Sequence, residues 1–293
     1  MFGFYFWGEV RMSRSRKVVL FLLVISVLIS IAYHILLGYV ERQLEARSHE
    51  NAYNECKKVW ATRGLIDENE TDVLNAQNSI ASVRNAFAHG AVGTEIDHFY
   101  DTELKKFIVS HDRPYKLKDG ELLTLEKFFN EAGNGSEYFW LDFKKLRHLS
   151  DDEMQDVVAR LNDITQHHEL KRRIYIEGAN PHNLSILKHA GFNTIFDTHP
   201  RPESFVLTTL MVNLYKIIYY FGDYTVMAMK HGDSDNPNYG PKAKAALGDI
   251  PVFLYHVPDE PALLQELSKS PVVRVFMLNG HTINRYTTTA CKN

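Results

Sequence analysis

The side chains best suited to acid-base and metal chemistry lie in and just after Gly93–Asp97. This run predicts a β-strand, and alternate side chains of a strand point to one face, so Glu95 and Asp97 project together. The apolar run Lys106–Ser110 predicts a second strand, which ends at His111. Two carboxylates beside an imidazole indicate half of a metal-dependent site with a group for proton transfer.

The elements that must position these side chains form an alternating pattern of apolar and amphipathic runs. The predicted strands are Val59–Ala61, Thr94–Asp97, Phe107–Val109, Tyr138–Phe143, Arg173–Glu177, Thr194–Phe196, Thr225–Ala228, Pro251–Tyr255 and Val273–Met277. The predicted helices between them are Ser79–Ala88, Thr124–Ala132, Asp151–His168, Asn183–Ala190, Ser204–Phe221 and Glu260–Ser268. Thr94–Asp97 and Phe107–Val109 count together as one position, and eight strand positions with helices between them predict a closed α/β fold, the (β/α)8 TIM barrel. An open doubly wound sheet is the alternative that periodicity alone does not exclude.

Barrel enzymes assemble their sites at the carboxyl ends of the strands, which narrows the set of candidate residues. The residues at or just after these ends are Arg63, Glu95, Asp97, His111, Asp142, Lys144, Glu177, Asp197, His199 and His256. Three carboxylates on facing strands suit a hard divalent cation, which prefers oxygen ligands and leaves room for phosphate oxygens. An Asp142–Lys144 ion pair on a strand remains the simpler reading of those two residues.

A membrane anchor is expected at residues 18–40, a 23-residue run without Asp, Glu, Lys or Arg. This run is long enough to span a bilayer, and it lacks the small-residue exit of a cleaved signal peptide. Because Arg and Lys residues precede it, residues 1–17 are expected in the cytoplasm. Residues 41–58 predict a polar helical stalk, and residues 59–293 predict an extracytoplasmic barrel domain. The chain is therefore expected to be a single-pass membrane protein in contact with lipid.

Composition and cysteine content set further limits. The chain has 293 residues, 45% hydrophobic and 24% charged, with a formal charge of −3 and no basic stripe with interleaved aromatics, so nucleic acid is not an expected partner. The two cysteines, Cys56 and Cys291, are placed to tie the ends of the domain together in an oxidising compartment. Two unpaired thiols are the equal alternative.

The ordered motifs of the chain resemble those of the glycerophosphodiester phosphodiesterase family. That family has a His-Arg-Gly after the first strand, an Asn-Ser/Thr opening the first helix, a Gly-Ala before a Glu-x-Asp strand, a His-Asp pair, and an acidic-x-Lys on the third strand. The corresponding pieces here are Thr62-Arg63-Gly64, Asn78-Ser79, Gly90-Ala91, Glu95-Ile96-Asp97, His111-Asp112 and Asp142-Phe143-Lys144. The Asp of the last motif is also similar to the related sphingomyelinase D branch.

The resemblance implies a metal-dependent phosphodiesterase acting on a glycerophosphodiester or a lysophospholipid-type small molecule. It implies that Mg²⁺ or Ca²⁺ is bound by Glu95, Asp97 and Asp142. It also implies that Arg63 and Lys144 contact the phosphate, with Lys144 and His111 as catalytic residues. The cation would neutralise the developing phosphate charge while an acid protonates the departing alcohol.

One member of the family's histidine pair is replaced, because Thr62 stands where the His-Arg-Gly motif begins. A threonine hydroxyl can hydrogen-bond to phosphate but is no general base near neutral pH. His256 or His199 is the expected substitute if either faces the site. Two alternatives therefore stay open: a non-catalytic barrel that binds phosphate or metal, and a sphingomyelinase D-like enzyme that forms a cyclic phosphate.

Overall fold

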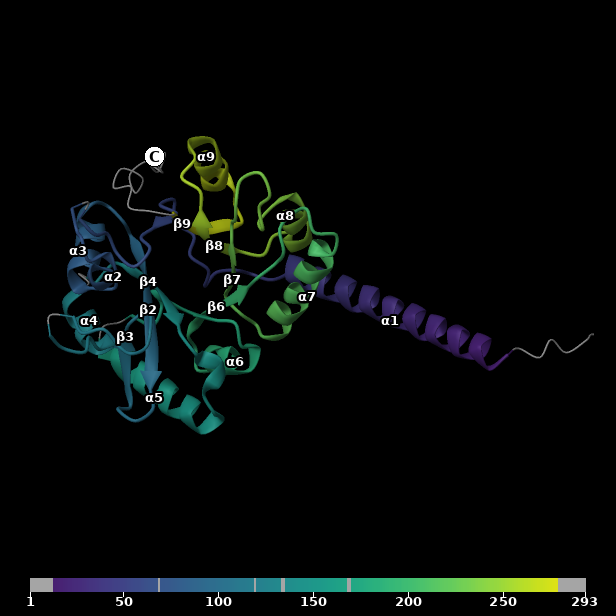
Figure 1. The fold of residues 1–293 in the computed structure, drawn as a ribbon, viewed down its shortest axis with the longest axis horizontal. Coiled ribbons are helices and arrows are strands. Elements are labelled where there is room, and N and C mark those ends of the chain that lie inside the picture. The colour runs from purple at the N-terminus through teal and green to yellow at the C-terminus, as the bar shows by residue number, and fades with distance from the viewer. Residues whose placement is uncertain (1–12, 68, 119, 133–134, 168–169, 279–293) are drawn as a thin grey trace, which may run out of the picture. The chain divides into compact units, whose positions relative to one another are not determined.

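The structure is a computed structural model that describes residues 13–67, 69–118, 120–132, 135–167 and 170–278 (Figure 1). The chain forms two compact units, one of residues 1–46 and one of residues 47–293. The first is built around a single helix, and the second contains every strand and the remaining described helices.

Helix α1 spans Arg14–Glu45. Its N-cap is Ser13, whose hydroxyl accepts a hydrogen bond from the Arg16 backbone N–H. It contains the expected span of residues 18–40 and is long and apolar enough to cross a bilayer. The helical stalk expected over residues 41–58 is shorter than predicted, because the helix ends at Glu45 and turns and bends follow. The reason is burial of Ala52 and Tyr53, which draws this segment out of helical geometry and into the second unit.

Nine strands form one sheet within the described part of the chain, in the order β1-β9-β8-β7-β6-β5-β4-β2-β3. Their bounds are β1 Val59–Trp60, β2 Gly93–Asp101, β3 Lys106–Val109, β4 Tyr138–Phe143, β5 Ile174–Gly178, β6 Asn193–Thr198, β7 Val226–Lys230, β8 Val252–Val257 and β9 Val273–Leu278. All neighbours are parallel except β2 and β3, which form an antiparallel pair. A parallel bridge between Ala61 and Thr94 joins β1 to β2 and closes the ring. The fold is the predicted (β/α)8 barrel, not the open sheet.

Helices cover the outside of this barrel (Figure 1). Their bounds are α2 Val73–Ala76, α3 Ile80–Ala88, α4 Leu125–Ala132, α5 Asp151–His167, α6 Pro181–His189, α7 Thr208–Phe221, α8 Pro241–Leu247 and α9 Pro261–Lys269, with a short 3₁₀ turn at Leu146–His148. Each predicted helix is present to within a few residues of its expected bounds. The short α2 and α8 were not predicted.

Aromatic side chains fill the amino-terminal end of the barrel. Tyr53, from the segment before β1, lies edge to face with Trp60 and Tyr138, at ring-centroid distances of 5.1 and 4.9 Å. The Tyr175 hydroxyl donates a hydrogen bond to the Asn51 carbonyl oxygen at 3.1 Å. Residues 51–55 thus act as the floor of the barrel and leave its opposite end open.

Two expectations from the sequence stay predictions. Residues 279–293 follow β9, so the predicted pairing of Cys56 with Cys291 lies outside the described residues and stays a prediction. The division of the chain into cytoplasmic, spanning and extracytoplasmic parts also stays a prediction.

Candidate active site

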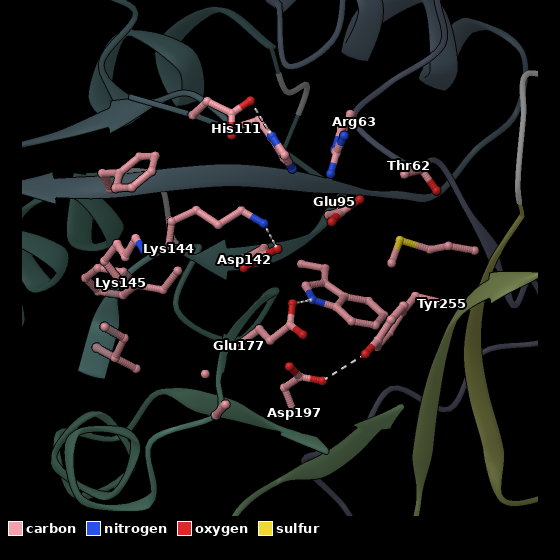
Figure 2. A pocket seen from close by; sticks show the side chains of 18 of the residues that line it. Thr62, Arg63, Glu95, His111, Asp142, Lys144, Lys145, Glu177, Asp197 and Tyr255 are labelled. Atoms are coloured by element: carbon pink, nitrogen blue, oxygen red, sulfur yellow. Dashed lines mark hydrogen bonds and ion pairs between the residues drawn. The ribbon is translucent and has the colours of Figure 1, made fainter. Parts of the chain in front are cut away.

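The three predicted cation ligands converge at the open end of the barrel. Strand register places Asp97 of β2 directly beside Asp142 of β4, and Glu95 lies two residues earlier on the same face of β2. Each of the three carboxylates offers an oxygen, and these oxygens all lie within 4.8 Å of one another. Figure 2 shows Glu95 and Asp142 facing the same cavity. The sequence pattern therefore located a true spatial cluster.

The cavity around this cluster has a volume of about 900 Å³ and opens at the carboxyl ends of the strands. Its lining includes most of the residues that sequence analysis placed there: Thr62, Arg63, Glu95, His111, Asp142, Lys144, Glu177, Asp197 and His256. Lys145, Arg147 and Arg113 add positive charge to the same lining. Asp97 lies beneath these residues, with its side chain fully buried.

Two cations flank the carboxylates. Arg63 Nε lies 2.8 Å from Asp97 Oδ2, and Lys144 Nζ lies 2.7 Å from Asp97 Oδ1. Lys144 also contacts Asp142. Because each cation keeps roughly a fifth of its side chain exposed, at 23% for Arg63 and 22% for Lys144, both can reach a ligand in the cavity. The ion pair that was the simpler reading of Asp142 and Lys144 is present, but it is part of this larger cluster.

Asn78 holds Asp97 in place from below. Its Oδ1 accepts the Asp97 backbone N–H at 3.0 Å, and its Nδ2 donates to Asp97 Oδ2 at 2.7 Å. Asn78 adopts a left-handed conformation with φ of 54°, which asparagine tolerates better than most residues. Sequence analysis matched Asn78 to a motif but did not assign it this role, because the bond joins residues nineteen positions apart.

The protonation of the three carboxyl groups differs sharply. Burial, together with the charges of Asp97 and Asp142, raises the pKa of Glu95 to about 8. Burial also raises the pKa of Asp142, although the Lys144 charge opposes this shift. For Asp97, burial alone would raise the pKa, but Lys144, Arg63 and the hydrogen bonds to this carboxylate outweigh it, so its pKa is lowered. Arg63 and Lys144 therefore do not offset the negative charge that an ionised Glu95 would carry.

A buried atom supports a cation at this position. Among the described residues, Glu95 Oε2 is buried and has no hydrogen-bond partner. An unpaired buried carboxylate oxygen is costly unless a ligand satisfies it. The donor set consists of carboxylate oxygens alone, which Mg²⁺ and Ca²⁺ prefer. The residues present therefore fit a hard divalent cation, although they do not choose between the two ions.

His111 enters the cavity from the end of β3, above the carboxylate cluster (Figure 2). Its Nδ1 lies 2.8 Å from Asp112 Oδ2, so the ring is oriented by its neighbour in the chain. With Nδ1 engaged, Nε2 is left to exchange a proton with a ligand. His111 therefore lies in the cavity lining, and its proton-transfer role stays a prediction.

Thr62 lines the cavity at the end of β1 but offers no titrating group there. Its hydroxyl donates a long hydrogen bond of 3.4 Å to the Leu278 carbonyl oxygen on β9. Of the two substitutes considered, His256 lines the cavity, and burial lowers its pKa, with Lys230 and Arg63 adding to the effect.

His199 is not brought into the cavity lining. Its side chain is 67% exposed, and its Nε2 lies 3.2 Å from Asp197 Oδ2. Its Nδ1 also lies 3.2 Å from the Tyr255 hydroxyl. The suggestion that His199 compensates for Thr62 is therefore not supported by the geometry.

The wall across from His111 carries a second polar group (Figure 2). Glu177 Oε2 accepts a 2.6 Å hydrogen bond from the Trp140 indole N–H, and burial raises its pKa well above the usual value. Tyr255 donates to Asp197 Oδ1 at 3.3 Å, and burial raises the pKa of Asp197 to about 6. Tyr255 was missed because an aromatic on a strand reads as core packing.

Comparison with known proteins connects this geometry to a known fold. No protein-family model matches the sequence, and no curated protein matches it. Solved structures do match. A glycerophosphodiester phosphodiesterase from Parabacteroides distasonis superposes with a TM-score of 0.52 and 18% identity, over 78% of this chain and 93% of that one. The chain has the glycerophosphodiester phosphodiesterase barrel fold.

Two further structures agree. A glycerophosphodiester phosphodiesterase from Thermotoga maritima matches with a TM-score of 0.51 and 14% identity, over 75% of this chain and 93% of that one. A phosphodiesterase from Oleispira antarctica, solved in complex with the product sn-glycerol-3-phosphate, matches with a TM-score of 0.51 and 14% identity, over 75% of this chain and 92% of that one. At these identities the likeness concerns the barrel itself, and the chemistry must be argued from the residues of this chain.

Proposed function

We propose that this chain is a cation-dependent phosphodiester hydrolase that acts on a glycerophosphodiester or a lysophospholipid-type substrate. The observation that carries the proposal is the cluster of Glu95, Asp97 and Asp142, with ligand oxygens within 4.8 Å, at the base of a cavity of about 900 Å³. A phosphodiester anion fits such a cavity only if cations offset the carboxylates. Arg63 and Lys144 supply protein cations, and the unpaired Glu95 oxygen provides the place for a metal ion.

The phosphate is held by the two protein cations. Arg63 presents a planar guanidinium, which can donate two parallel hydrogen bonds to phosphate oxygens. Lys144 reaches the same region as a point charge and already contacts two of the carboxylates. Asp97 and Asn78 fix Arg63 and Lys144 from below, so the phosphate meets donors that are already oriented.

A bound Mg²⁺ or Ca²⁺ ion would supply further positive charge against the non-bridging phosphate oxygens as negative charge develops on them. The chain's own residues then manage protons. In hydrolysis, the P–O bond to the departing alcohol breaks, water supplies the new P–O bond, and a proton must reach the alcohol oxygen. His111 Nε2, oriented through the Asp112 contact to Nδ1, is placed to give or take such a proton.

The second proton carrier is His256 in this proposal. It lines the cavity with Thr62 and Arg63, and its lowered pKa favours the neutral imidazole that a general base requires. The purified full-length chain should release a phosphomonoester from glycerophosphodiesters or lysophospholipids when Mg²⁺ or Ca²⁺ is present, and should release none after chelation. Absence of product under conditions in which a Thr62→His variant is active would overturn the enzymatic proposal.

A second candidate function is binding without catalysis, and Thr62 favours it. Loss of one acid-base group typically costs about a hundred- to ten-thousandfold in rate, which is enough to leave a phosphate-binding barrel. Calorimetry with Mg²⁺, Ca²⁺ and sn-glycerol-3-phosphate separates the two candidates. Binding of these ligands by the natural chain without turnover would support the binding role.

The chemistry of the product separates hydrolysis from the sphingomyelinase D-like alternative. Internal attack by a substrate hydroxyl forms a cyclic phosphate and releases the same alcohol, whereas water yields a phosphomonoester. Phosphorus NMR distinguishes these products directly. Asp142 two residues before Lys144 is the feature that keeps the cyclic route open.

The anchor bears on the choice of substrate. A chain held at a bilayer by α1 meets lipid-derived phosphodiesters at high local concentration, which favours a lipid headgroup or lysophospholipid over a soluble metabolite. A cytoplasmic amino terminus and an extracytoplasmic barrel remain part of this proposal, since Arg and Lys residues precede the span.

A further inference from the structure

Helix α7 differs from an ordinary surface helix because its outward face is apolar. Its fourteen residues, Thr208–Phe221, contain one charged residue, Lys216, and that side chain is buried at 4% exposure. Its exposed side chains include Leu210 at 40%, Leu214 at 46% and Phe221 at 64%. A helix that is apolar on both its inner and outer faces normally lies in a core or against lipid.

Another wall of the same barrel, covered by a helix two positions earlier in the chain, provides the contrast. Helix α5 begins with Asp151, Asp152 and Glu153, and its exposed face carries further charges. This is the pattern expected where a barrel helix faces water. The apolar outer face of α7 is thus a property of one sector of the barrel and not of the fold.

The apolar face continues past the amino-terminal end of α7. Phe205, Val206 and Leu207, in the turn that precedes the helix, are exposed by 41%, 83% and 48%. This turn follows β6, whose carboxyl end lies at the open end of the barrel. We call Phe205, Val206, Leu207, Leu210, Leu214 and Phe221 the α7 face. It extends along the barrel wall from the rim of the active-site end to the opposite end, about 21 Å for the helix alone.

The opposite end of α7 is where the chain enters the barrel unit. Arg47, the first residue of that unit, lies 2.7 Å from Asp223, and its guanidinium lies over the Tyr219 ring at 5.3 Å. It also donates to the Tyr224 carbonyl oxygen at 2.9 Å. The entry point is therefore fastened to the last turn of α7 and to the loop that follows it.

We propose that the α7 face rests on the lipid bilayer into which residues 18–40 insert. Six residues separate Val40 from Arg47, so the covalent chain allows at most about 25 Å between the end of the span and the foot of α7. An apolar surface this near to the membrane is buried most readily in its interfacial layer. Val206 and Phe221, at the two ends of the face, are the most exposed of its six side chains.

The inference does not depend on catalysis. A bilayer under the α7 face would bring the rim near Val206 to lipid level, whether the barrel hydrolyses a phosphodiester or only binds one. A second copy of the chain is the competing occupant, and the experiment below separates the two.

Lipid-borne photolabelling of the full-length chain tests the proposal. The chain is reconstituted into phosphatidylcholine vesicles that contain a phospholipid with a diazirine on its acyl chain, irradiated and mapped by mass spectrometry. Peptides covering residues 205–221 should carry lipid adducts. Leu104, which is 50% exposed in the turn between β2 and β3, is the matched apolar control and should carry none.

Two variants sharpen the test. Leu210→Asp combined with Leu214→Asp should abolish labelling of 205–221, whereas Leu104→Asp should leave it unchanged; near-UV circular dichroism checks that each variant is folded. Unlabelled 205–221 in the natural chain would overturn the proposal without any variant. Protein-to-protein cross-links between two copies at 205–221, in place of lipid adducts, would assign the face to a dimer and would also overturn it.

Discussion

The Lys144 ammonium lies 2.7 Å from Asp97 Oδ1 and also contacts Asp142 Oδ2. Lys144 thus neutralises part of the carboxylate cluster from within. The neighbouring carboxylates raise its pKa against the effect of burial, so it stays charged throughout the physiological range. Its charge must therefore compete with any metal ion for the same oxygens, even as it offers a donor to a phosphate ligand.

Replacement of Lys144 should separate metal binding from turnover. In a Lys144→Met variant, the carboxylates lose a competing cation, so affinity for Mg²⁺ or Ca²⁺ should rise. Turnover should fall by about a hundredfold or more, because a charge-assisted contact to the phosphate worth about 3 kcal/mol is lost. Titration calorimetry and phosphomonoester release measure the two effects. Lys145→Met is the control, and parallel changes in the two variants would contradict this role.

Glu95 should be indispensable for the cation. Its Oε2 is buried and has no hydrogen-bond partner among the described residues. Glu95→Gln should remove metal binding and reduce turnover by about a thousandfold, equivalent to about 4 kcal/mol. Because glutamine is close in shape to the protonated Glu95 of the metal-free site, the thermal midpoint without metal should not fall. Metal affinity equal to that of the natural chain would reject the predicted ligand set.

Metal affinity should depend on pH through Glu95. In the metal-free site the pKa of Glu95 is raised to about 8 by burial and by the two aspartates, so the group is largely protonated at neutral pH. The cation binds the ionised form, hence affinity should increase by up to about tenfold per pH unit from pH 6 towards 8 and then level off. Calorimetry in buffers of different ionisation enthalpy should show proton release on binding. A flat profile across this window would count against the assignment.

Thr62→His should increase turnover. The side chain at this position lines the cavity beside Arg63, where an imidazole can exchange a proton with the substrate. If the natural chain has no second proton carrier, a restored acid-base pair should raise the rate by about a hundred- to ten-thousandfold. If His256 already fills this role, Thr62→His should give a small gain, and His256→Ala should remove the activity of the natural chain but not that of the variant. Rates measured for the four combinations decide between these outcomes.

Asn78 should contribute to stability as well as to the site. Asn78→Gly keeps the left-handed backbone accessible but leaves the buried Asp97 N–H without its acceptor, at a cost of about 1–3 kcal/mol. Denaturant unfolding should show this loss. Asn75→Ala is the control. Asn75 is exposed and lies in α2, three residues before Asn78, so its replacement should leave the free energy of unfolding nearly unchanged.

Much of the barrel was predictable because strand and helix periods differ. The predicted strand Tyr138–Phe143 coincides with β4, and Glu95, Asp97 and Asp142 follow from alternation along β2 and β4. Helix α8 was not predicted, since Pro and Gly at its start are typical of a loop and its seven residues carry little periodicity.

The sequence pattern does not predict contacts between strands that lie far apart in the chain. The bond from Tyr255 to Asp197 spans fifty-eight positions, and Tyr255 alone reads as an ordinary strand aromatic. His199 was expected to face the site if it replaced the missing imidazole, yet its ring lies 67% exposed against Asp197. Local pattern places a residue near a strand end, but only the tertiary packing decides whether its ring enters the cavity.

The floor of the barrel carries a mechanical consequence. Tyr53 lies among the core aromatics, six residues after Arg47, which is itself fastened to Asp223. If residues 18–40 span a membrane, as proposed, a pull on them would meet the contact between Arg47 and Asp223 first and the packed floor second. Such a load would pass into the strands at their amino ends, away from the open end that holds Glu95, Asp97 and Asp142.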